Sequence, residues 1–184
     1  MKKTTHFSLL ALVLVAAILG GCGGSSSDTP AIVTTTTTTT ATTAVLTLMT
    51  SGTLSTSGTG TRIGTVQVTV SLPAGVTIKA SPFSAGSTTM VADAGVVTAS
   101  GAASGADLAM AIYRSGASST HMVDVYIVKN SGFSTGEFAT VNCDIASGYT
   151  PVAADFTLSG FAANAMDTGS PLPALSSGIT AAIQ

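Results

Sequence analysis

The stretch TVQVTVS, residues 65–71, alternates valine with polar side chains at every position. Successive side chains of a strand point to opposite faces, so the three valines share one face and the polar residues share the other. The sequence therefore predicts a β-strand with one face in a core and one in water. The segment LPAG, residues 72–75, follows as a turn, because proline fixes φ and glycine permits a positive φ.

Short runs of this kind, separated by turn residues, continue to the end of the chain. Further strands are expected at residues 44–50, 76–78, 95–99, 107–113, 122–129, 137–145, 154–159 and 178–183. Strand 107–113 carries large apolar residues on one face and Ala, Ala and Tyr on the other, which predicts a central strand covered on both sides. About nine short strands without helical periodicity predict an all-β fold, an antiparallel β-sandwich.

The segment before the first of these strands has low complexity. Residues 23–43 read GGSSSDTPAIVTTTTTTTATT and carry almost no charge. A flexible coil of this length spans about 25 Å on average. We interpret it as a spacer, and its threonine run could carry O-linked sugar.

The first residues have the organisation of an export signal. Lys2 and Lys3 precede an apolar run at residues 7–18, which is too short to span a bilayer and lacks a basic stop-transfer flank. Leu19-Gly20-Gly21-Cys22 then resembles a bacterial lipobox. The resemblance implies cleavage before Cys22, acylation of Cys22 and attachment to a membrane, and Gly23 in place of Asp favours the outer membrane.

Three parts of the chain follow from these patterns. Residues 1–21 are expected to be a lipoprotein signal peptide, residues 22–43 a lipidated cysteine with its linker, and residues 44–184 a single β-sandwich domain.

Without Lys2 and Lys3, four of the six basic residues remain against eight acidic ones. Four scattered cations cannot release enough phosphate counterions for nucleic-acid binding, so DNA and RNA are not expected partners.

The residues that usually carry catalysis or metals are scarce. His121 is the only histidine after the signal peptide, and no G-x-S-x-G nucleophile elbow is present, so we expect a solvated histidine at a strand end. One histidine and one cysteine cannot complete a zinc site. Asn164, Asp167 and the Thr168-Gly169 turn could offer oxygens to calcium, as could Asp93 or Asp107 in other loops. Turn formation explains Asn164 and Asp167 without an ion. We expect no enzyme activity and no cofactor.

Cys143 alternates with Val141 and Ile145, which places its side chain on an apolar strand face. The sequence therefore predicts a buried and unreactive thiol. Cys22 is the only other cysteine, and the lipobox assigns it to lipid, so no disulfide within the chain is expected.

The order of segments in the second half resembles a cohesin. Residues 122–129, MVDVYIVK, are followed by a loop and by GFSTGEFATVNCD at 132–144, in which Gly136, Phe138 and Ala139 match a strand of that family. Residues 154–159 resemble the family's late strand, and residues 161–169 resemble the turn after it. The resemblance covers roughly residues 44–175 and implies a jelly-roll sandwich of nine strands. Its relatives include dockerin-binding cohesins and carbohydrate-binding modules.

Strand 122–129 supplies the candidate contact surface. Val123, Val125 and Ile127 are predicted to face the core, which leaves four residues outward: Met122, Asp124, Tyr126 and Val128. Either another element covers this apolar stripe, or it is a protein-binding patch.

Three functions remain open for a membrane-anchored domain without catalytic residues. The first is protein binding or scaffolding, with a dockerin-like partner as one possibility. The second is polysaccharide binding, which the absence of Trp disfavours and which would depend on Tyr113, Tyr126 and Tyr149. The third is a structural coat or adhesion component.

Overall fold

The computed structural model describes residues 41–54, 61–115 and 120–184. The described residues all lie within one compact unit, Thr38–Gln184. The predicted signal peptide, Cys22 and nearly all of the predicted linker therefore lie outside the described residues. None of the helices in the described part of the chain is long and apolar enough to cross a membrane.

The described residues form strands and two short 3₁₀ helices. The helices are η1 (Gly101–Ala103) and η2 (Ala153–Asp155). The strands are β1 (Thr43–Gly52), β2 (Ile63–Leu72), β3 (Val76–Thr77), β4 (Ala80–Pro82), β5 (Met90–Ala92), β6 (Val97–Ala99), β7 (Leu108–Ser115), β8 (His121–Phe133), β9 (Gly136–Ile145), β10 (Thr157–Ala165) and β11 (Leu175–Ile183).

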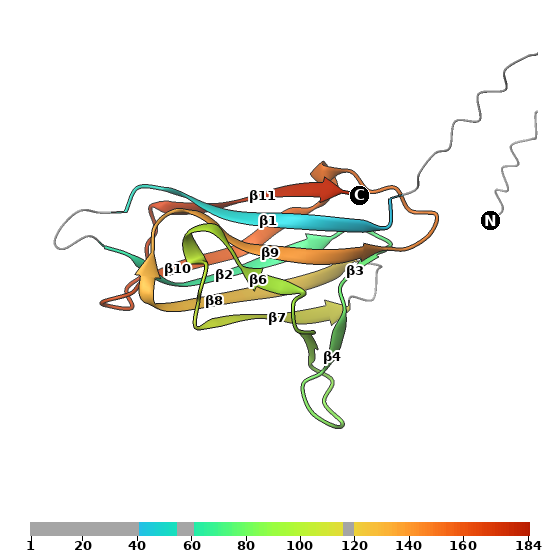
Figure 1. The fold of residues 1–184 in the computed structure, drawn as a ribbon, viewed down its shortest axis with the longest axis horizontal. Coiled ribbons are helices and arrows are strands. Elements are labelled where there is room, and N and C mark those ends of the chain that lie inside the picture. The colour runs from blue at the N-terminus through green and yellow to red at the C-terminus, as the bar shows by residue number, and fades with distance from the viewer. Residues whose placement is uncertain (1–40, 55–60, 116–119) are drawn as a thin grey trace, which may run out of the picture. The chain divides into compact units, whose positions relative to one another are not determined.

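The strands make two sheets whose ladders are all antiparallel. One sheet has the order β11-β1-β9-β3, with β6 also paired to β9, and the other has the order β10-β2-β8-β7-β5-β4. Figure 1 shows the two layers, with β11, β1 and β9 above and β2, β8 and β7 below. The segment between β10 and β11 connects one sheet to the other. Residues of both sheets contribute to one core, so the two sheets form an antiparallel sandwich.

One hydrophobic core lies between the sheets. Its largest fully buried side chains include Leu46 and Leu48 from β1, Val68 from β2, and Phe133 and Phe138 from β8 and β9. The inner faces thus bury alternate residues over much of β1, β2 and β9, as the period-two pattern predicts. The all-β, antiparallel prediction is confirmed.

Each of the nine predicted strands has a counterpart, but the boundaries of several differ. β8 continues through the predicted loop to Phe133, and β10 runs over residues 157–165 rather than 154–159. Residues 161–165, which the family resemblance assigned to a turn, are therefore in a strand, and the turn follows at residues 166–168. Two further strands, β4 and β5, were not predicted. They are short, and Pro82 is accommodated because β4 is an edge strand.

Strand β7 is central, as predicted, since it pairs with both β5 and β8. The prediction that it is covered on both sides is wrong. Its alanines lie on the core side, whereas Leu108 on the other side is 42% exposed. The large aliphatic side chains of this strand, Leu108, Met110 and Ile112, are therefore on the outer face of the sheet, and Tyr113 lies on the alanine side.

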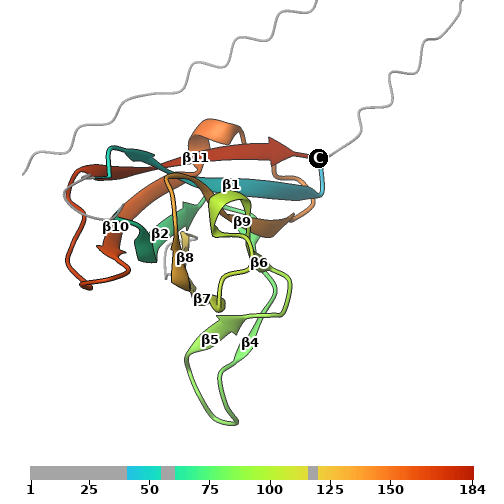
Figure 2. The ribbon, with the colours of Figure 1, turned by 60° about the vertical axis from the view of Figure 1, so that its left-hand side comes forward.

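The beginning and end of the domain meet at the same end of the sandwich. The backbone N–H groups of Thr42 and Thr43 donate to the carbonyl of Gln184 at 2.8 and 3.1 Å. Strands β4 and β5 form a hairpin that projects away from the two layers (Figures 1 and 2).

Candidate functional site

The candidate site is the outer face of the six-stranded sheet, where the predicted contact residues lie. Pairing between β8 and β7 places Val128 opposite Leu108, Tyr126 opposite Met110, and Asp124 opposite Ile112. Directly opposed residues of antiparallel strands point to the same side, so β7 and β8 contribute to one surface. We call this surface the β7–β8 face, and its residues are Leu108, Met110, Ile112, Arg114, Met122, Asp124, Tyr126 and Val128.

The neighbouring strand changes the character of the sheet. On β2, the residues opposed to Val128, Tyr126 and Asp124 are Thr65, Gln67 and Thr69. The outer surface is therefore polar on β2 and largely apolar on β7 and β8. Only the tertiary register brings the apolar residues of β7 beside those of β8.

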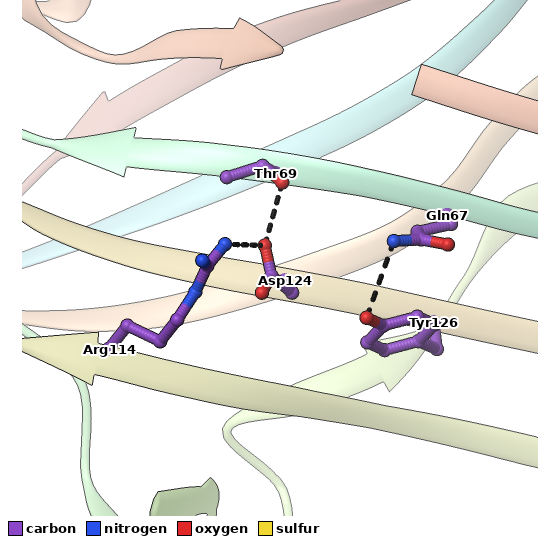
Figure 3. A network of polar contacts seen from close by, with 5 residues as sticks. All are labelled: Gln67, Thr69, Arg114, Asp124 and Tyr126. Carbon is purple, nitrogen blue, oxygen red and sulfur yellow. Dashed lines mark hydrogen bonds and ion pairs between the residues drawn. The ribbon is translucent and has the colours of Figure 1, made fainter. Parts of the chain in front are cut away.

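Asp124 is the centre of a polar network within the apolar surface (Figure 3). Its Oδ1 accepts a hydrogen bond of 2.6 Å from the Thr69 hydroxyl. The same oxygen forms an ion pair with Arg114 Nη2 at 2.7 Å. Asp124 as a whole is only 7% exposed, whereas the Arg114 side chain is 55% exposed. The carboxylate is thus already paired, and the guanidinium remains accessible to a partner.

Tyr126 is tied to β2 by a weaker contact. Gln67 Nε2 donates to the Tyr126 hydroxyl at 3.3 Å, and this pair lies beside the Asp124 network in Figure 3. Tyr126 and Val128 are half-buried, while Met122 is 37% exposed. The four predicted contact residues share the outer side, but Asp124 is buried and already paired with Thr69 and Arg114. Arg114 holds the accessible charge instead.

The sequence interpretation missed Arg114, Thr69 and the large residues of β7 as members of this site. The alternation of residues 107–113 had already placed Leu108, Met110 and Ile112 on one face. What it could not supply was the register with β8, because no local pattern says which strands are neighbours.

Cys143 lies on the inner side of β9 and is 3% exposed. Burial, with a smaller contribution from the negative charge of Asp144, raises the pKa of its thiol to about 12. Cys143 is a free cysteine, and the prediction of a buried thiol is confirmed.

His121 is half-buried rather than solvated, because it packs on a tyrosine. Its ring is stacked on Tyr113 with centroids 5.5 Å apart, and its Nδ1 lies 2.9 Å from the Tyr113 hydroxyl. Burial raises the pKa of Tyr113.

The three tyrosines considered for sugar stacking lie on different surfaces. Tyr113 is opposed to the inward Val123, whereas Tyr126 points outward and Tyr149 lies in a loop with 46% exposure. The three tyrosines therefore do not form one stacking platform.

Two of the side chains considered for calcium, Asn164 and Asp107, already have local hydrogen-bond partners. Asn164 Nδ2 donates to Thr65 Oγ1 at 3.1 Å, and Asp107 Oδ2 accepts from the backbone N–H of Asn130 at 2.7 Å. Asp167 lies in the turn after β10. Over residues 41–54, 61–115 and 120–184, no three His, Cys, Asp or Glu side chains are grouped as metal ligands would be.

Comparison of the chain with protein-family models, curated proteins and solved structures finds no match.

Proposed function

We propose that this protein is an exported lipoprotein whose β-sandwich binds a protein partner through the β7–β8 face and catalyses no reaction. The observation that carries the proposal is the composition of that face. It places Met, Tyr, Leu and Ile side chains around an exposed guanidinium, and Met, Tyr and Arg are enriched where proteins contact one another.

The ion pair also supports a role in recognition. Because Asp124 is held by Thr69 and Arg114, the side chains of three adjacent strands are fixed relative to one another. A surface ordered before binding loses less conformational entropy on association. Arg114 can still donate to a carboxylate of the partner, because a guanidinium has several N–H groups and more than half of this side chain is exposed.

The cohesin resemblance remains part of this proposal. The antiparallel sandwich is compatible with a cohesin-like jelly roll, and a dockerin-like partner is the occupant that the resemblance implies. Polysaccharide binding is the alternative. It is less well supported because Tyr113, Tyr126 and Tyr149 do not share one surface.

Site-specific photocrosslinking in the native host tests the proposed surface. A photoreactive phenylalanine derivative in place of Tyr126 should give one discrete protein adduct. The same derivative in place of Thr180, on the outer face of the other sheet, should not give it. Equal labelling from both positions, or a polysaccharide adduct from position 126, would exclude the proposed protein contact.

Fractionation of a Cys22→Ala variant tests the anchor. The wild-type chain should remain with membranes, and the variant should lose signal-peptide cleavage at that bond and its acyl chains. A variant that is still processed at the same bond and still sediments with membranes would contradict the lipobox assignment.

A further inference from the structure

The β4–β5 hairpin carries an aromatic side chain that the sandwich does not use. Phe83 follows β4 directly and is 74% exposed. The hairpin stands clear of both layers in Figures 1 and 2. An exposed phenylalanine at the tip of a projecting hairpin has no packing role within the described part of the domain, so it is a candidate contact site.

The hairpin is uncharged throughout. Residues 80–92 read ASPFSAGSTTMVA, and the first charged residues on either side are Lys79 and Asp93. The backbones of these two residues are joined at the base of the hairpin, where Asp93 N–H donates to the Lys79 carbonyl at 3.0 Å. The charges therefore stay at the base, and the projecting part can leave water without desolvating an ion.

Three backbone N–H groups of the tip are hydrogen-bonded within the hairpin. Phe83 N–H donates to the Thr89 carbonyl at 2.9 Å, and Ser87 N–H donates to the Ser84 carbonyl at 2.9 Å. Thr89 N–H donates to the Ser87 hydroxyl at 3.1 Å. Gly86, with φ of 79°, permits this tight turn. Since unsatisfied N–H groups are costly outside water, this pairing lowers the cost of placing the tip in an apolar boundary.

The hairpin starts beside the point where the preceding segment joins the domain. Lys79, Thr43 and Gln184 line the same hollow of about 390 Å³. β1 begins at Thr43. The predicted spacer after Cys22 ends at this residue, so a lipid on Cys22 would hold this end of the domain toward the bilayer. A coil of the spacer's length averages about 25 Å, which leaves the hairpin within reach of the same membrane.

We propose that the β4–β5 hairpin contacts the membrane to which the protein is anchored and inserts Phe83 at the boundary between headgroups and acyl chains. The lipid anchor of the proposed function is a premise of this inference. Aromatic and aliphatic side chains of interfacial segments occupy that boundary, and the uncharged tip suits a lipid surface of any headgroup charge. The contact orients the domain and leaves the β7–β8 face free for a partner.

The absence of Trp from the chain provides a direct test. In a Phe83→Trp variant, the new residue is the single tryptophan and reports its own surroundings. Met166→Trp is the matched control, because Met166 is 41% exposed and lies at the opposite end, where its N–H donates to the Arg62 carbonyl at 2.8 Å. Both full-length lipoproteins are purified from membranes and reconstituted into phosphatidylcholine vesicles, with and without bromine on the acyl chains.

Bromine quenches only tryptophan that reaches the acyl region. We expect the fluorescence of Trp at position 83 to fall at least about twofold in brominated vesicles, and that of Trp at position 166 to stay unchanged. Vesicle flotation is measured on the same samples. A chain that floats but shows no quenching at position 83, or equal quenching at both positions, would refute the hairpin contact while leaving the anchor intact.

A chain that does not float would refute the anchor itself, and the hairpin contact with it. A blue shift at position 83 that requires an added protein fraction and occurs without vesicles would assign the tip to a protein partner and overturn the proposal.

Discussion

The two outer faces of the sandwich differ sharply, although the two inner faces are built alike. On the five-stranded sheet, a row of threonines crosses four strands, because Thr180, Thr47, Thr140 and Thr98 are opposed in turn on β11, β1, β9 and β6. On the six-stranded sheet, the β7–β8 face holds long apolar side chains around an ion pair. The inner faces supply the shared core, so the difference between the two sheets lies in their outward side chains alone.

The largest effect should be seen at the inner side of the five-stranded sheet, at Cys143. In a Cys22→Ala background, Cys143 is the only thiol of the chain. Its labelling in the native protein at pH 8 should be at least about a thousandfold slower than in denaturant, since a buried thiol reacts only when the structure opens. The rate of maleimide addition measures this. Labelling of the folded domain at the rate of the unfolded chain would place Cys143 on the outer side.

The same thiol makes the free energy of unfolding depend on pH in the alkaline range. Burial raises its pKa from the ordinary 9.0 to about 12, so the neutral thiol is favoured in the folded state. The stability that this provides is complete below pH 9 and is lost as pH rises toward about 12. Urea denaturation at several pH values should show a steeper loss of stability for wild type than for Cys143→Ala. Equal slopes would contradict the burial of the thiol.

The likeness of the inner faces can be tested with one core residue from each sheet. Leu48 on β1 and Ile127 on β8 are both 0% exposed. Leu48→Ala and Ile127→Ala should each lower the free energy of unfolding by about 2–5 kcal/mol, because each leaves a cavity in the shared core. Chemical denaturation measures both. A loss below about 1 kcal/mol at either position would show that the two sheets do not share one packed core.

The difference between the outer faces predicts a smaller effect at Arg114. Arg114→Ala leaves the buried Asp124 carboxylate with the Thr69 hydroxyl alone, and we expect a loss of about 1–2 kcal/mol, reduced from that of a buried pair because Arg114 is exposed. Thr180→Ala, on the outer face of the other sheet, should change stability by less than about 0.5 kcal/mol. If both variants denature at the same urea concentration, the ion pair has no structural role.

Within the β7–β8 face, a smaller change in stability is expected at Tyr126 than at Arg114. Tyr126→Ala removes a half-buried ring whose hydroxyl accepts a 3.3 Å bond from Gln67, so the free energy of unfolding should change by less than about 1 kcal/mol. Partner affinity should fall about tenfold or more, whereas Thr47→Ala should leave it unchanged. Titration of the crosslinked partner measures the affinity. An unfolded Tyr126→Ala protein would mean that this ring belongs to the core.

Local alternation determined much of this protein from the sequence alone. It identified strand 65–71 with its inward valines, the inward position of Cys143 and the outward position of Met122 and Tyr126, because the side of a strand on which a residue lies depends only on a period of two. Composition likewise separated the strand-rich part from the low-complexity segment before it, and the scarcity of basic residues argued against nucleic acid.

Tertiary structure alone decided which strands are neighbours and which outward residues are exposed. Strand order depends on long-range pairing, so the sequence could not place Leu108 beside Val128 or bring Arg114 and Thr69 to Asp124. It also gave no sign that Asp124 is buried, because an aspartate in an outward position normally faces water and loses it only when neighbouring strands surround it. The projection of Phe83 was equally hidden, since the strands that carry it are too short to show a period.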